Sequence, residues 1–423
     1  MSRQKNADCS TLWEEAIQLI PGGLNSSIQI STAERPLFIK KVRGSKVICC
    51  DNHSYIDFIM SRGALITGHA HPKIIETLKK NVVQGTCHGL PTQQEIELAE
   101  LITEAFPSIQ KVRLVNSSTE ALITAIRLAS AFTKRSKILK FTGCHNGQSN
   151  IFSCSDLNNK NSNDMISIQY NDVEALANTI DKHRNKNGES EFASIVIETC
   201  YTSMGVIMPK KGFLQSLRNI ATKEKIVLIF DEVNSGFRAS FGGAQELYGI
   251  MPDITVLGKV LGGGLPIGAF GGKEEIMQLL APEGKVHQTG NLTVNHLSVA
   301  AGIATLKLLR HKRVYHRLET LGTELEEGIL TATKTVCIPV TINRVGSMLS
   351  LYFTQNRILD FEDVMSSDPE FLLKFHVEMR KRGVLIPPTQ FESLSISLAH
   401  SDQDIRHTIS AVKKALEIVS REI

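Results

Sequence analysis

Short apolar runs that alternate with helical stretches constrain the fold of this chain more than any other feature. Helical periodicity fills most of the intervals between the runs, at 95–105, 119–133, 173–183 and 212–223. Strands that are buried on both faces and connected by helices are typical of a mostly parallel sheet. The sequence therefore predicts an α/β fold, with candidate strands at Val112–Val115, Ile138–Phe141, Ser194–Ile197, Ile226–Phe230 and Ile254–Leu257.

Composition and charge argue against several classes of protein. The chain has 423 residues and a formal net charge of +4, which is small for a protein that binds nucleic acid by releasing counterions. It contains no apolar run of about 18 residues that would suggest a membrane span, and its first residues do not resemble a secretory signal. We therefore expect a cytoplasmic protein that binds neither nucleic acid nor membranes.

The cysteines and histidines give no pattern of a metal site. The eight cysteines are dispersed without a C-x-x-C pair, which predicts reduced thiols. His69 and His71 would share one face of a strand, but no third ligand lies near them in the sequence. We expect no bound metal.

The segment 116–120, with the sequence Asn-Ser-Ser-Thr-Glu, lies between a predicted strand and a predicted helix. Ser117 and Glu120 have the spacing of a capping box, so the segment could simply begin the helix. Free N–H groups, hydroxyls and the helix dipole at the same place would also bind a phosphate. The segment alone does not distinguish these two interpretations.

A second candidate is Asp231, which follows the apolar run 227–230. Its carboxylate is expected at the C-terminal edge of a buried strand, where α/β sheets bind ligands. The acid of a Walker-B ATPase motif has a similar setting, but that motif requires a G-x-x-x-x-G-K-[ST] loop, which the chain lacks.

A third candidate is Lys259, a lone lysine that follows an apolar strand and is flanked by glycines. A surface lysine in a turn would look the same. A lysine among apolar residues, however, loses solvation, which lowers its pKa and makes its amine nucleophilic. Lys259 follows Asp231 by about one strand–helix–strand step, so the acid and the amine are expected at neighbouring strand ends.

Together these three sites predict a pyridoxal-phosphate enzyme. In such enzymes a lysine bonds covalently to the cofactor, an aspartate pairs with the ring nitrogen, and a helix N-terminus holds the phosphate. The chain resembles class III aminotransferases of fold type I, and within that family the glutamate-1-semialdehyde 2,1-aminomutases. The resemblance runs nearly end to end and rests on the segments 20–26, 68–72, 115–121, 231–233, 236–238, 257–259 and 262–272.

The resemblance implies a role for each matching residue. Lys259 would be the cofactor lysine and Asp231 the partner of the ring nitrogen. It also implies a homodimer with shared active sites, and a large domain at 61–308 beside a small α+β domain formed by 1–60 and 309–423. Further cofactor contacts are implied for Ser117, Ser118 and Thr119 (phosphate), Val233 and His145 (ring faces), Ser203 (ring hydroxyl), and Gly290 and Asn291 (phosphate of the neighbouring subunit).

The chain departs from the pattern at three of these cofactor contacts, because His145, Ser203 and Asn291 stand where the family has a tyrosine, an asparagine and a threonine. The other departures from the aminomutase pattern concern the substrate. Gln29 stands where that group has a carboxylate-binding arginine, and Arg62 stands at the position of a tryptophan, whereas Glu392 matches. Arg62 could bind a substrate carboxylate instead, or it could simply pair with Glu392. The segment 153–165 is much shorter than the gating loop of the group.

These departures favour an aminotransferase that moves an amino group by a ping-pong mechanism between a small-molecule amino donor and a keto or aldehyde acceptor. Such an enzyme releases its first product and needs no long lid. The alternatives are the aminomutase itself, an amino-acid racemase or epimerase, and an inactive relative. The last is disfavoured because Lys259 and Asp231 are both present.

Overall fold

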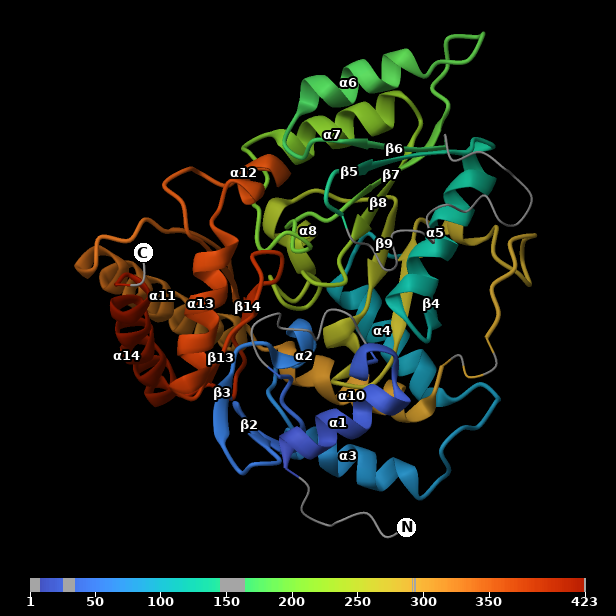
Figure 1. Cartoon of the computed structure of the whole chain (residues 1–423). Coiled ribbons are helices and arrows are strands. Elements are labelled where there is room, and N and C mark those ends of the chain that lie inside the picture. The colour runs from blue at the N-terminus through green and yellow to red at the C-terminus, as the bar shows by residue number, and fades with distance from the viewer. Residues whose placement is uncertain (1–7, 26–34, 145–163, 291, 293, 422–423) are drawn as a thin grey trace.

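The computed structural model describes residues 8–25, 35–144, 164–290, 292 and 294–421. Within these residues the largest sheet has seven strands in the order β4-β10-β9-β8-β7-β5-β6 (Figure 1). Strand β10 is antiparallel to both of its neighbours, and the other pairs are parallel. The strands are β4 (Lys111–Val115), β5 (Lys137–Phe141), β6 (Met165–Ile168), β7 (Phe192–Ile197), β8 (Val227–Asp231), β9 (Ile254–Leu257) and β10 (Gly268–Gly272). The α/β prediction is confirmed. Two strands of this sheet were not predicted: β10, whose Gly-Ala-Phe-Gly-Gly sequence is poor in strand-forming residues, and β6.

Helices cover both faces of this sheet, which explains why its central strands are apolar throughout. Alternate residues of β8 face opposite ways: Ile229 packs in the core with helix α5 (Ser118–Thr133), whereas Leu228 and Phe230 pack in the core on the other face. The helices that complete the two layers are α4 (Gln93–Ala105), α6 (Val173–Lys182), α7 (Phe213–Lys223), α8 (Gly243–Tyr248), α9 (Glu274–Met277) and α10 (His296–Leu309).

Two smaller sheets lie beside the large one. The first joins the two ends of the chain, because β13 (Val384–Leu385) pairs in parallel with β3 (Ser54–Asp57). Its other strands are β1 (Ile39–Arg43) and β2 (Lys46–Cys49), and the second sheet contains β11 (Thr341–Val345), β12 (Met348–Tyr352) and β14 (Leu394–Ser395). The division into domains at residues 60 and 308 remains a prediction.

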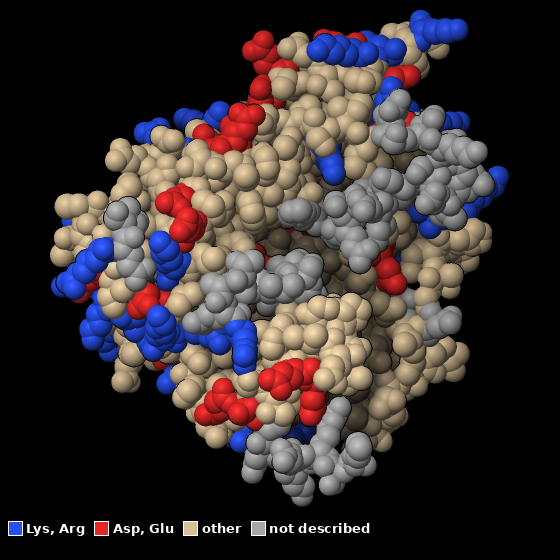
Figure 2. Space-filling model, in the orientation of Figure 1, with Lys and Arg blue, Asp and Glu red and all other residues tan. Residues whose placement is uncertain are grey.

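In the described parts of the chain the remaining helices are α1 (Cys9–Leu19), α2 (Met60–Gly63), α3 (Pro72–Val82), α11 (Lys312–Thr335), α12 (Phe361–Met365), α13 (Pro369–Lys381) and α14 (Asp402–Val419), and 3₁₀ turns occur at Pro21–Gly23 and Lys259–Gly262. None of the helices in the described ranges is long and apolar enough to cross a membrane. On the face drawn in Figure 2, basic side chains form small groups with acidic ones among them.

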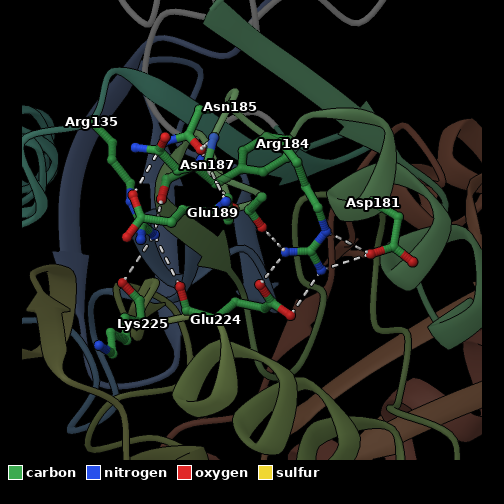
Figure 3. A network of polar contacts seen from close by, with 11 residues as sticks. Arg135, Asp181, Arg184, Asn185, Asn187, Glu189, Glu224 and Lys225 are labelled. Atoms are coloured by element: carbon green, nitrogen blue, oxygen red, sulfur yellow. Dashed lines mark hydrogen bonds and ion pairs between the residues drawn. The ribbon is translucent and has the colours of Figure 1, made fainter.

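A polar network fixes the N-terminal ends of the central parallel strands (Figure 3). Arg184, before β7, holds both carboxylate oxygens of Glu224, at 2.8 and 3.0 Å. Arg135, before β5, donates to the carbonyl oxygens of Phe192, Glu224 and Lys225. These contacts tie β5, β7 and β8 together at one edge of the sheet. The opposite, C-terminal edge is therefore left for side chains that carry chemistry.

Candidate active site

Three ionisable residues follow the C-terminal ends of adjacent parallel strands. Glu198 follows β7, Asp231 is the last residue of β8, and Lys259 comes two residues after β9. Strands β7 and β9 flank β8, so the three side chains converge at one edge of the sheet. The sequence predicted Asp231 and Lys259 at this edge but did not single out Glu198.

Lys259 is fixed by its backbone and by two oxygen atoms. It begins a 3₁₀ turn in the left-handed region, with φ of +45°, a strained conformation for a residue with a side chain. Its amine donates to the carbonyl oxygen of Arg62 at 2.8 Å and also to Oδ1 of Asn234. The pKa of Lys259 is lowered to about 8, chiefly by burial and also by the nearby cations Arg238 and Arg62, against the opposing effect of Glu198. The neutral, nucleophilic form of the amine is therefore much more populated near neutral pH than in an ordinary lysine.

Asp231 is buried, and one of its two oxygen atoms has no donor. Oδ1 accepts from the N–H of Val233 at 3.0 Å, whereas Oδ2 has no hydrogen bond with any residue that the structure describes. The pKa of Asp231 is raised to about 7, chiefly by burial and also by the carboxylate of Glu198, while the Val233 N–H and Lys259 oppose the rise. A cation beside Oδ2 would satisfy this carboxylate and restore its charge.

Glu198 is a buried carboxylate that the sequence analysis missed. It accepts from the N–H and the hydroxyl of Thr202 at 3.0 and 2.7 Å, from the N–H and hydroxyl of Ser203, and from the thiol of Cys144. The sequence contained a signal for it, because an apolar strand that ends in an acid is the same pattern that identified Asp231. Ser203, predicted near the ring hydroxyl of a cofactor, is thus held on the carboxylate of Glu198.

The N-terminus of α5 forms a narrow cradle against β9 and β10. Ser117 caps the helix by accepting from the N–H of Glu120 at 3.2 Å. The carboxylate of Glu120 accepts from Asn116 instead of closing a full capping box with Ser117. A Cβ added to Gly268 would meet the carbonyl oxygen of Ser117 at 2.3 Å, and one added to Gly258 would meet Ser118 at 3.0 Å. These glycines bring the helix N-terminus close to Lys259.

Arg62 lies in an unusual turn beside Lys259. Three successive residues without glycine, Met60–Arg62, have positive φ angles of 46°, 53° and 57°; we call this segment the left-handed turn. The side chain of Arg62 pairs with Glu392, with 3.0 Å between Nη2 and Oε1. Burial raises the pKa of Glu392, while Arg62 and Lys259 lower it. The pair therefore lies close to the amine of Lys259.

The structure describes some of the residues that were predicted to contact the cofactor or the substrate, and others lie outside the described residues. Val233 is half-buried, and its Cγ1 lies 3.5 Å from the place that a Cβ on Gly258 would occupy. Thr119 lies in the first turn of α5. Gly290 is half-buried in the segment before α10. The predictions for Gln29, His145 and Asn291, and for nearly all of the 153–165 loop, fall outside the described residues.

These features fit pyridoxal phosphate. They combine an amine of lowered pKa, a buried carboxylate with one oxygen that has no donor among the described residues, and a helix N-terminus that glycines allow to lie close to Lys259. Such a set at the C-terminal edge of a mostly parallel sheet defines a pyridoxal-phosphate-dependent enzyme of fold type I.

Comparisons with known proteins give the family. A profile of the class III aminotransferases matches residues 29–416. The chain is 45% identical to the glutamate-1-semialdehyde 2,1-aminomutase of Thermodesulfovibrio yellowstonii, over 97% of this chain and 99% of that protein. It is 41% identical to glutamate-1-semialdehyde 2,1-aminomutase 2 of Brevibacillus brevis, over 99% of both. The chain therefore belongs to the class III aminotransferase family, an enzyme family that depends on pyridoxal phosphate and acts on small molecules.

Solved structures agree with this assignment. An omega-transaminase from Sphaerobacter thermophilus superposes with a TM-score of 0.90 at 30% identity, over 99% of both chains. A glutamate-1-semialdehyde aminomutase from Pseudomonas aeruginosa superposes with a TM-score of 0.87 at 20% identity, over 97% of this chain and 94% of that one, which supports the fold alone.

The predicted reaction type was wrong. The departures at Gln29 and Arg62 and the short 153–165 loop favoured an intermolecular aminotransferase, but the full-length relatives at 40–45% identity are named as aminomutases. The inference failed because three local differences were weighed against a resemblance that extends over the whole chain.

Proposed function

We propose that this protein is a glutamate-1-semialdehyde 2,1-aminomutase. The observation that carries the proposal is the full-length identity of 40–45% to proteins of that name. The reaction moves the amino group of the substrate from C2 to C1, while the oxygen moves from C1 to C2 by exchange with water, and it yields 5-aminolevulinate. Since the two carbons exchange oxidation states, no external oxidant or second substrate is needed.

Each polar group of the site has a part in this proposal. When bound, pyridoxal phosphate would supply the group through which the amino group is exchanged and an acceptor for the electrons of the substrate. The amine of Lys259 would take a proton from one carbon and return it to the other, as suits a group whose pKa lies near 8. Oδ2 of Asp231 would face the ring nitrogen, and Ser117, Ser118 and Thr119 would hold the phosphate.

Three further residues are proposed around the ring. Val233 and His145 would pack on its two faces, and the hydroxyl of Ser203 would lie near the ring hydroxyl. The hydrogen bonds from Ser203 to Glu198 support this position, because they fix the serine at the end of β7.

Arg62 is proposed to bind the substrate carboxylate. Its guanidinium has one partner, Glu392, and its other N–H groups have none among the described residues. Those groups leave room for a bidentate contact with a carboxylate. Glu392 would hold the guanidinium in place, and Gln29 would contribute a neutral hydrogen bond at most.

We also propose a homodimer in which Gly290 and Asn291 reach the partner's site. Exposed apolar side chains lie in this segment and in the loop between α3 and α4: Leu292 is 62% exposed, Val83 83% and Leu90 76%. A hydrogen bond of 2.8 Å from Asn295 to the carbonyl of Thr86 ties the two exposed loops together. An apolar surface of this kind is typical of a subunit interface.

Two finer expectations belong to the same proposal. We place the protein in the cytoplasm and in a biosynthetic role. The described cysteines are thiols without a disulfide, which suits a reducing compartment.

The test is conversion of glutamate-1-semialdehyde by the purified holoenzyme. We expect stoichiometric formation of 5-aminolevulinate without an amino donor or a keto acid. A strict requirement for a second substrate would contradict the proposal, and mass spectrometry of the products would detect it.

A further inference from the structure

The amine of Lys259 contacts one side chain that the sequence analysis did not single out. Asn234 comes three residues after Asp231, and its Oδ1 accepts from the amine. The carbonyl oxygen of Arg62 accepts from the same amine at 2.8 Å. No other acceptor contacts the amine among the described residues. The nitrogen of the Asn234 amide has no hydrogen bond there either, so nothing else in the described structure explains this side chain.

Two acceptors are enough to orient a lysine amine. A neutral amine has two N–H donors and one lone pair, whereas an ammonium group has three N–H donors. When both oxygen atoms are engaged, two vertices of the tetrahedral nitrogen are fixed. The remaining vertex, a lone pair or an N–H depending on the charge, then points in a single direction. A fixed direction is what efficient proton transfer requires.

The Arg62 carbonyl is itself held in place from both sides. Before the left-handed turn, the carboxylate of Asp57 accepts from the N–H groups of residues 59 and 60 and contacts Nε2 of His69 at 2.8 Å. After the turn, Arg238 donates two hydrogen bonds to the carbonyl of Gly63. The backbone acceptor is therefore rigid, and the side chain of Asn234 completes the pair.

We propose that Asn234 and the Arg62 carbonyl form an acceptor pair that orients the amine of Lys259 whenever the amine is not bonded to the cofactor. Asn234 thereby becomes a functional residue of the site, because it touches the reacting nitrogen. The inference rests on the proposed role of Lys259 as the reactive lysine, but it does not depend on the identity of the substrate.

The test compares three full-length variants stripped of cofactor. Competitive acetylation with peptide mapping reports how the reactivity of Lys259 depends on pH, because only the neutral amine reacts. The wild-type midpoint is expected at about pH 8. Asn234→Leu removes an acceptor that stabilises the ammonium form, so its midpoint falls by roughly one pH unit. Asn234→Asp places a carboxylate on the amine, so its midpoint rises.

Asn219→Leu is the matched control, since Asn219 is exposed and its side chain bonds only to Gln215 among the described residues; its midpoint stays at the wild-type value. In the holoenzyme, Asn234→Leu lowers kcat about tenfold or more with little change in KM. An unchanged midpoint in Asn234→Leu, or shifts of the same sign in both Asn234 variants, would overturn the inference. If the midpoints move as expected but wild-type enzyme does not convert glutamate-1-semialdehyde, the acceptor pair stands and the proposed function fails.

Discussion

Arg238 holds the carbonyl oxygen of Gly63 with two N–H groups, Nε at 3.0 Å and Nη2 at 2.6 Å. Its third nitrogen, Nη1, donates to the hydroxyl of Ser347 and the carbonyl of Ile396. The guanidinium is fully buried, and none of these partners is a carboxylate. Burial lowers the pKa of Arg238 to about 10. One side chain thus joins the left-handed turn to two segments from the C-terminal part of the chain.

The first prediction concerns this residue. Arg238→Met is expected to lower the free energy of unfolding by about 3 kcal/mol, because it leaves several buried oxygen atoms without donors. Chemical denaturation would measure the loss. Arg184→Met, at the opposite edge of the sheet, is the control for arginine removal: it leaves the acetylation midpoint of Lys259 unchanged, whereas Arg238→Met raises it by removing a nearby cation.

The second prediction is that borohydride reduction fixes the cofactor on Lys259. Lys259→Ala is expected to lose activity by about three orders of magnitude or more, because no other described amine occupies its position. Peptide mapping by mass spectrometry identifies the modified residue. A reduced cofactor on a different lysine would refute the assignment.

The third prediction is a pH dependence caused by Asp231. In the cofactor-free protein its pKa is raised from 3.8 to about 7, so between these values the folded state binds more protons than the unfolded state. The contribution of Asp231 to stability therefore decreases as pH rises from about 4 to 7. In Asp231→Asn, stability should depend less on pH between about pH 4 and 7, which thermal unfolding at a series of pH values would show. The same variant should lose at least about 100-fold in activity.

The fourth prediction tests Arg62 as the carboxylate anchor. Arg62→Ala is expected to raise KM for glutamate-1-semialdehyde by about 10- to 100-fold, the value of one lost charged contact. Arg62→Lys should recover part of the loss, since it keeps the charge without the bidentate geometry. Unchanged KM in Arg62→Ala would mean that Arg62 serves only to pair with Glu392.

The fifth prediction follows from shared active sites. Lys259→Ala and Asn291→Ala are each expected to be impaired as pure proteins. When the two are unfolded together and reassembled in equal amounts, hybrid dimers contain one intact site, so activity recovers to about a quarter of the wild-type value. No recovery, with dimers verified by sedimentation, would show that each site is built from a single chain.

The sequence was sufficient for the parts of the site that lie at strand ends. Asp231 and Lys259 each follow an apolar run, and neighbouring parallel strands bring their C-terminal ends to one edge of the sheet. The local sequence pattern and the order of the strands in the sheet are enough to place both residues. It would have found Glu198 as well had it been applied to the strand that precedes it.

The contacts around Lys259 could not be predicted in the same way. The left-handed turn contains no glycine or asparagine, so nothing in its local sequence indicates positive φ angles. Its shape depends on Asp57 and Arg238, which are close to it only in the folded protein. The pairing of Asn234 with Lys259 likewise arises from tertiary structure. Residue types at strand ends were therefore predictable, but their partners were not.

The pairing of β3 with β13 has a consequence for the order in which the protein matures. The ribosome releases Ser54–Asp57 long before it releases their partner Val384–Leu385. Until then that edge of the sheet is open and prone to wrong pairing. Asp57, which anchors the left-handed turn, is the last residue of β3. The nascent chain therefore completes the scaffold around Lys259 only after Val384–Leu385 have emerged, so folding intermediates that form earlier expose the unpaired edge of β3.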